Sequence, residues 1–236
     1  MPDNENTKQI KSRQRVADHG EVFTNPREVN AMLDLVRDES FRLDSRFLEP
    51  ACGDGNFLIE ILRRKLSLLK DVKSQTEWEF KSLIAVGSCY GIDILPDNAE
   101  ACRTRLEEYV LSQHRASERL NARSAVEETH APCEHLEEMQ QEPYLFSLRY
   151  MLQKNIVCGD ALTYRTAEDK PIVFCEWTPI AGSMQFSRRD FQFDFLVTQS
   201  HQYSLFDEQG EVQSFDEPVR SYPPLHYTQL YRYDTL

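Results

Sequence analysis

The sequence has no long hydrophobic run among its 236 residues. Its longest apolar stretches are only a few residues, and the polar residues 1–15 have no apolar segment behind them. A membrane-spanning helix and a secretory signal both require a continuous apolar segment, so the sequence predicts neither. We expect a protein without membrane association.

Paired metal-binding or disulfide motifs are also absent. The six cysteines are scattered along the chain, no two of them are spaced as C-x-x-C, and the six histidines show no metal-ligand spacing. This pattern argues against a disulfide framework and a zinc site, and it favours a reducing compartment. We therefore predict a cytoplasmic protein without a bound metal.

The sequence lacks an excess of positive charge. It contains 27 lysines and arginines against 39 aspartates and glutamates, a formal net charge of −12, and its pI is about 5.0. A protein that binds phosphate groups over its whole surface needs clustered lysines and arginines. The composition excludes a protein of that class, although it does not exclude a local basic patch. Hydrophobic residues make up 40% of the chain, which is enough for the core of one folded domain.

Hydrophobic periodicity predicts alternating strands and helices. We expect strands at residues 46–49, 88–94, 155–158, 171–176 and 193–198, and helices at residues 27–38, 56–70, 77–85, 96–113 and 144–153. Strands that alternate with helices are mainly parallel and joined by right-handed crossovers. The prediction is an α/β sandwich with a mainly parallel sheet and helices on both faces.

Composition marks two flanking segments and one insertion around this domain. Residues 1–19 are polar and without periodicity, so we expect an N-terminal arm. Residues 116–142 are charge-rich and read as a polar insertion. The domain is predicted to cover residues 20–203, and residues 204–236 are expected to form a C-terminal extension.

The most informative motif is EPACGDGNF, residues 49–57. Gly53 and Gly55 permit a tight turn with positive φ and a close approach of ligand to backbone, and the following helix offers free N–H groups. Glu49 closes the preceding strand. The motif differs from the G-x-G-x-x-G of dinucleotide folds, which points away from a pyrophosphate. An ordinary strand-to-helix turn is the alternative.

Two further strands end in an aspartate. Asp93 in GIDI can accept hydrogen bonds from both hydroxyl groups of a ribose, and Ile94 beside it can pack against an adenine face. Asp160 in GDAL can accept a hydrogen bond from an adenine amino group, with Leu162 on the ring. For Asp93 the alternative is an ordinary strand-end aspartate near the start of a helix. For Asp160 it is a common Gly-Asp turn.

Together these motifs resemble those of a known family. GEVFTN at residues 20–25, EPACGDGNF, GIDI and NIVCGDAL at residues 155–162 are similar, in this order, to the cofactor motifs of S-adenosylmethionine-dependent adenine-N6 DNA methyltransferases of restriction-modification systems. The likeness covers residues from about 20 to 200. It implies a Rossmann-like methyltransferase sandwich that binds S-adenosylmethionine.

The resemblance assigns nine residues to the cofactor, from its methionine part to its adenine. In that order they are Phe23 and Thr24, then Glu49, Gly53 and Gly55 around the amino acid end, then Asp93 and Ile94, and finally Asp160 and Leu162. Two of them also have a structural alternative: Phe23 could be a core residue, and Thr24 could cap the following helix.

The chain departs from the family at the catalytic motif. It has no Asn/Asp/Ser-Pro-Pro-Tyr/Phe tetrapeptide, whose polar groups accept hydrogen bonds from the target amino group while its ring stacks on the flipped base. Ser200 and Tyr203, in Ser-His-Gln-Tyr, are the expected catalytic substitutes. Residues 176–179 are a second candidate, although Trp177 there also reads as a core aromatic.

These features predict an adenine-N6 DNA methyltransferase of a restriction-modification system. Few residues follow Tyr203, so we expect DNA to be recognised with a separate specificity or nuclease subunit. We interpret Arg188 and Arg189 as part of a solvated turn, and the alternative is that they contact phosphates. One alternative function is a non-catalytic, cofactor-binding subunit or regulator. Another is a methyltransferase that acts on a small molecule or a protein.

Overall fold

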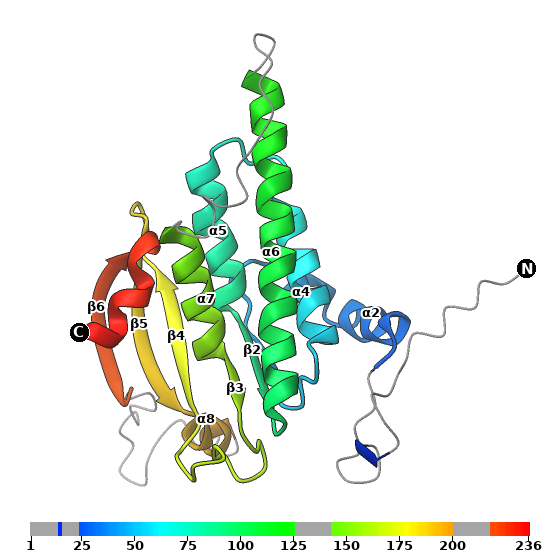
Figure 1. Cartoon of the computed structure of the whole chain (residues 1–236), viewed down its shortest axis with the longest axis vertical. Coiled ribbons are helices and arrows are strands. Elements are labelled where there is room, and N and C mark those ends of the chain that lie inside the picture. Colours follow the sequence, from blue (N-terminus) through cyan, green and yellow to red (C-terminus); the bar gives the residue numbers. More distant parts are fainter. Residues whose placement is uncertain (1–13, 16–23, 126–142, 201–217) are drawn as a thin grey trace, which may run out of the picture.

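The computed structural model describes residues 14–15, 24–125, 143–200 and 218–236 (Figure 1). Its helices are α2 (Pro26–Asp34), α3 (Arg37–Ser40), α4 (Asn56–Leu66), η1 (Ser67–Leu69), α5 (Gln75–Gly87), α6 (Pro96–Ala125), α7 (Pro143–Asn155), α8 (Phe193–Ser200) and η3 (Tyr227–Thr235). Its strands are β1 (Phe47–Glu49), β2 (Cys89–Asp93), β3 (Ile156–Cys158), β4 (Val173–Pro179), β5 (Gln185–Gln192) and β6 (Arg220–His226).

The first three strands form a small parallel sheet in the order β1-β2-β3. Glu49 lies opposite Gly91, and Asp93 lies opposite Cys158. The connections pass through α4 and α5, and then through α6 and α7, because parallel strands need long crossovers. All three strands therefore end at the same edge, near the first turn of α6.

The remaining strands form a separate antiparallel sheet in the order β4-β5-β6. The expected Rossmann-like sandwich with a mainly parallel sheet is therefore wrong, because the chain builds two three-stranded sheets instead. The physical reason lies in the connection between β4 and β5. It is a turn of only a few residues around Gly182, and a connection this short can join only antiparallel strands.

Residues 193–198 form part of helix α8 and not the expected strand. Phe193 is buried, and Val197 packs against the same small cluster, whereas Phe195 and Leu196 are exposed. Residues i and i+4 lie on the same face of a helix, so this burial pattern is helical. The sequence does not reveal it, because the residues between the two buried positions are also apolar.

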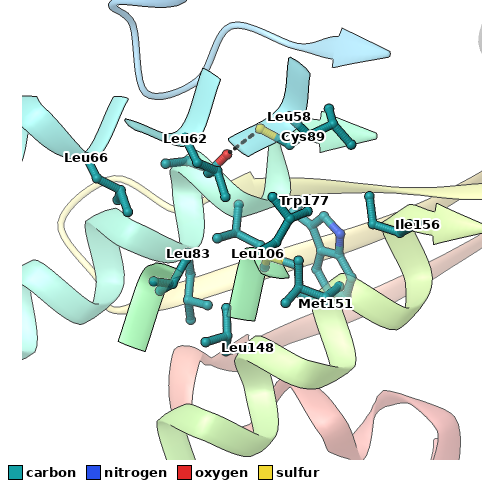
Figure 2. Packing of buried hydrophobic residues seen from close by; sticks show 14 of the residues in the cluster. Leu58, Leu62, Leu66, Leu83, Cys89, Leu106, Leu148, Met151, Ile156 and Trp177 are labelled. Carbon is teal, nitrogen blue, oxygen red and sulfur yellow. Dashed lines mark hydrogen bonds between the residues drawn. The ribbon is translucent and has the colours of Figure 1, made fainter. Parts of the chain in front are cut away.

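Helix α7 lies between the two sheets and contacts α5, α6, β3, β4 and η3. Figure 2 shows the core that results, in which leucines from α4, α5, α6 and α7 belong to one cluster with Trp177 of β4, and Met151 lies beside the indole. The indole Nε1–H of Trp177 donates to Asn155 Oδ1 at 2.9 Å. Trp177 therefore joins the antiparallel sheet to the helix that leads into β3.

The segment expected as a C-terminal extension supplies β6 and η3 to this core. Tyr227, Leu230 and Tyr233 of η3 are buried, and the Tyr233 hydroxyl donates to the carbonyl of Phe186 at 2.6 Å. Long α6 also takes in residues 116–125 of the expected insertion, whereas residues 126–142 lie outside the described residues. None of the described helices is both long and apolar enough to cross a membrane.

Candidate functional site

A cavity of about 530 Å³ lies where the three parallel strands end. We call it the strand-end cavity. Its lining comes from four segments that are far apart in the sequence: Thr24, the turn after β1, the residues after β2 and the residues after β3. Seven of the nine residues assigned to the cofactor line it, namely Thr24, Glu49, Gly53, Asp93, Ile94, Asp160 and Leu162. Gly55 belongs to the same turn, and Phe23 lies outside the described residues.

The turn after β1 requires its glycines. Gly53 and Gly55 have φ values of 54° and 92°, a region that residues with a side chain rarely adopt. A Cβ on Gly55 would also lie 2.8 Å from Cys102 Sγ of α6. The backbone of the turn therefore lies close to α6 at Gly55.

Asp93 holds this turn in place. Its Oδ2 accepts a hydrogen bond from the N–H of Gly53 at 2.8 Å. Its Oδ1 accepts from the N–H of Leu95 at 2.9 Å and from Nδ2 of Asn98 at 3.2 Å. A carboxylate has about four acceptor positions, so three of them are engaged within the protein. One position remains for a ligand, fewer than the two that the sequence suggests.

Two exposed apolar side chains line the cavity. Ile94 is 56% exposed and Leu162 is 88% exposed, although both line the cavity wall. Asp160 also lines the cavity, and its Oδ1 accepts a hydrogen bond from the N–H of Leu162 at 2.8 Å. This arrangement offers two apolar surfaces and a carboxylate, which suits a flat ring with a polar edge.

Glu49 supplies a further carboxylate to the cavity. Burial raises the pKa of its carboxyl above the ordinary value, and a hydrogen bond from the N–H of Ala51 at 3.4 Å opposes this shift. An anion that is partly removed from water gains from a cationic partner. Glu49 is therefore suited to hold a ligand ammonium group.

A second cavity of about 370 Å³ adjoins the first. The two share Ile94, Gly159 and Asp160, and the second extends along the loop of residues 163–169. Tyr164 and Asp169 of this loop have positive φ values. The candidate site therefore continues from Asp160 along this loop.

Sequence reasoning missed the residues that brace the turn from α6 and α4. Arg105 Nη1 pairs with the Asp54 carboxylate at 2.8 Å and donates to Asn56 Oδ1 at 3.1 Å. Asn56 Nδ2 donates in turn to the carbonyl of Thr24 at 3.2 Å. The polar positions within the glycine motif are the signal for Asp54 and Asn56, whereas no pattern in the sequence links Arg105 to them.

The expected catalytic substitutes Ser200 and Tyr203 fall outside the part of the chain whose side chains the structure describes. Ser200 is the last residue of α8, and its side chain lies outside the described residues, as does all of Tyr203. The second candidate, residues 176–179, lies in β4, where Trp177 is a buried core residue. Glu176 is held in ion pairs with Arg46 and Arg189.

Arg188 is not in a solvated turn. Its side chain is buried and forms two hydrogen bonds to the Asp190 carboxylate, at 2.7 and 2.8 Å. The guanidinium also lies 4.5 Å from the centre of the Tyr222 ring. The interpretation of Arg188 as a surface residue is therefore wrong, because an internal carboxylate and aromatic rings replace water around it.

The described residues contain no group of three or more His, Cys, Asp or Glu side chains that could hold a metal ion. The groups that the strand-end cavity offers to a ligand are therefore carboxylates, backbone atoms and apolar side chains. Comparison with models of known families, with curated proteins and with solved structures found no match to this chain.

Proposed function

We propose that the strand-end cavity binds S-adenosylmethionine and that the protein is a methyltransferase acting on adenine N6 in DNA, as part of a restriction-modification system. One observation carries this proposal. Residues from Thr24 to Leu162, chosen only because their motifs resemble those of such enzymes, line a single cavity. A shared edge of parallel strands brings the strand-end residues together, but it does not by itself bring Thr24, which precedes α2, to the same cavity.

The lining fits the chemical groups of this cofactor. The cavity volume of about 530 Å³ lies within the range of roughly 300–1,000 Å³ that is common for small-molecule sites. Glu49 would bind the ammonium group of the amino acid end, and the glycine turn would allow its carboxylate to approach the backbone. Ile94 and Leu162 would cover the adenine, and Asp160 would accept from its amino group.

The cofactor would supply a methyl group on a sulfonium sulfur. Transfer forms a bond from the acceptor nitrogen to the methyl carbon and breaks the bond from carbon to sulfur, which leaves a neutral thioether, and the nitrogen releases a proton to solvent. Little acid–base chemistry is required, so the task of the protein is to bind, orient and exclude water. The proposal requires only three parallel strand ends and not a mainly parallel sheet.

A non-catalytic cofactor-binding subunit is the second candidate. It is favoured by the absence of the usual catalytic tetrapeptide from the sequence and by the roles of Glu176 and Trp177 in ion pairing and core packing. Under either candidate we propose that DNA is engaged with a separate specificity or nuclease subunit, since a chain with net charge −12 is poorly suited to hold DNA alone.

Calorimetric titration of the full chain with S-adenosylmethionine tests cofactor binding. Asp160→Ala is expected to weaken binding by roughly tenfold, the loss of one charge-assisted hydrogen bond. Glu168→Ala, an exposed acid in the loop that follows, is the matched control. Absence of binding to the folded wild-type chain would refute the proposal.

Incubation with labelled cofactor and unmethylated bacterial DNA separates the two candidates. Label in adenine N6 of the DNA supports the methyltransferase. Binding without transfer, with and without candidate partner subunits, supports the non-catalytic subunit. Transfer to a protein or a small molecule would contradict both.

A further inference from the structure

A smaller cavity of about 220 Å³ lies beside the free edge of β1. We call it the edge pocket. Its walls are apolar and largely aromatic: Phe47 and Leu48 of β1, Tyr90 of β2, Phe174 and Phe191 of the antiparallel sheet, and Leu196 of α8. We propose that the edge pocket binds a purine nucleotide, the methyl acceptor. This inference rests on the proposed function only for the acceptor role.

The walls of the pocket suit a flat ring. Tyr90 and Phe174 meet edge to face, with ring centres 5.3 Å apart, and the Tyr90 hydroxyl is engaged with the carbonyl of Cys175 at 3.0 Å. Both rings are therefore fixed in position. Leu48 and Leu196 line the same pocket and are 43% and 41% exposed. A ring that enters between these groups would bury aromatic and aliphatic surface on both of its faces.

The backbone of Leu48 provides a polar edge inside this apolar pocket. The N–H of Phe47 donates to the carbonyl of Ser88 at 2.9 Å, so Phe47 and Glu49 direct their backbone groups toward β2. In a parallel ladder the intervening residue directs its N–H and C=O the other way. In the described part of the chain no strand pairs with β1 on that side.

Leu48 thus offers a donor and an acceptor next to each other. A base with an amino group beside a ring nitrogen, such as adenine, presents the complementary pair. The amino group would donate to the Leu48 carbonyl, and the ring nitrogen would accept from the Leu48 N–H. Burial of these backbone groups without a partner would be unfavourable, which favours a base over a purely apolar ligand.

Two arginines at the pocket favour an attached phosphate. The side chains of Arg46 and Arg189 are 64% and 45% exposed, and both pair with Glu176, which is only 10% exposed. Two guanidinium groups share one carboxylate, so one positive charge is not neutralised. Arg189 also stacks on Phe191, 5.4 Å from the ring centre. These contacts hold both guanidinium groups at the pocket, where they could pair with the phosphate of a bound nucleotide.

The edge pocket lies next to the strand-end cavity. Leu48 lines the first, and Glu49 lines the second. One residue along a strand is about 3.3 Å. An acceptor base and a cofactor in the two sites would therefore be held by consecutive residues of β1.

The test is a titration of the full chain with adenosine 5′-monophosphate while S-adenosylhomocysteine saturates the strand-end cavity. We expect the nucleotide to bind to this complex. Leu48→Pro removes an N–H that the sheet does not use, and Leu196→Trp fills the pocket from α8. Each should weaken nucleotide binding roughly tenfold and leave S-adenosylhomocysteine binding unchanged. Leu68→Trp, at a leucine of similar exposure on η1, is the matched control.

Two further comparisons assign the polar contacts. Purine riboside 5′-monophosphate, which lacks the amino group, should bind about threefold to tenfold more weakly than the adenosine nucleotide. Arg46→Met and Arg189→Met should reduce the preference for the nucleotide over adenosine. Strict competition between the nucleotide and S-adenosylhomocysteine, or equal affinity in all pocket variants, would overturn the proposal. So would binding of an aromatic peptide in place of any nucleotide.

The same titrations separate the two proposals. If S-adenosylhomocysteine does not bind but the nucleotide does, with loss in the Leu48 and Leu196 variants, the proposed function fails and the edge pocket stands. If S-adenosylhomocysteine binds and the nucleotide does not, the edge pocket assignment fails alone. Circular dichroism of each variant shows that the chain is folded in every titration.

Discussion

The carboxylate of Asp93 accepts a hydrogen bond from the backbone N–H of Gly53 at 2.8 Å and so joins the end of β2 to the glycine turn after β1. The same side chain accepts from Leu95 and Asn98 at the start of α6. An acid that the motif assigns to ligand binding is thus also a structural crosslink between three segments. Substitution of Asp93 must therefore affect the fold and the site together.

We expect Asp93→Ala to lower the free energy of unfolding by about 1–3 kcal/mol, because its buried donors lose their acceptor. Binding of S-adenosylmethionine should weaken by roughly one to two orders of magnitude as the turn loses its anchor. Urea denaturation and calorimetry measure the two effects. Glu100→Ala, on the exposed side of α6, should change neither. Full stability of the Asp93 variant would contradict the crosslink.

Glu49→Gln should separate stability from binding. Burial raises the Glu49 pKa in the folded state, so the folded protein holds this proton more tightly than the unfolded chain does. The resulting stabilisation is fully present below the ordinary carboxyl pKa of about 4. It is lost as pH rises through the raised pKa. At pH 7 the variant should therefore unfold at a higher temperature than the wild type, and the difference should vanish near pH 4. Cofactor affinity should fall. Equal melting temperatures at both pH values would contradict this role.

Gly55→Ala is expected to destabilise the protein for two reasons, a positive φ and the close contact with Cys102 Sγ. Gly182 also has a positive φ but has no atom within 4 Å of an added Cβ, so Gly182→Ala isolates the backbone effect of about 1–2 kcal/mol. The Gly55 variant should lose more than this in chemical denaturation. Cys102→Ala in the same chain should recover part of the excess, and equal losses at the two glycines would remove the packing argument.

Arg188→Met should lower the free energy of unfolding by about 3–5 kcal/mol, since it leaves the buried Asp190 carboxylate without its cation. Arg220 lies over the same Tyr222 ring at the same distance of 4.5 Å but is exposed. Arg220→Met therefore removes a comparable ring contact and should have a small effect. A further change of Asp190 to Asn in the Arg188 variant should restore part of the lost stability.

The sequence predicts the part of the fold that local signals specify. The strands β1, β2 and β3 were identifiable because each is a short apolar run that ends in a turn signal, as in GIDI before Pro96. The convergence of Glu49, Asp93 and Asp160 followed from the shared edge of parallel strand ends. The additional donors to Asp93 did not, because they depend on how the turn and the first residues of α6 meet in three dimensions.

The antiparallel sheet was missed because its stabilising partners are distant in the sequence. Within QFSRRDFQ of β5, the two arginines suggest a solvated turn. Arg188 is buried because rings from several distant segments lie over it, among them Tyr222 of β6 and Tyr233 of η3. In α8, a compact run of apolar residues fits both a strand and a helix, and the packing of Phe193 against Tyr164 and Phe174 decides between them.

The two sheets differ in how far apart along the chain their strands lie, and this has a consequence for the order of folding. The hairpin of β4 and β5 closes through a few residues around Gly182, and hairpins of this kind form within about 1–10 μs. Each parallel pairing of β1 with β2 and of β2 with β3 must first close a long crossover, which is slower. The ligand-binding edge is therefore expected to assemble late, on a scaffold that the hairpin and α7 have already begun.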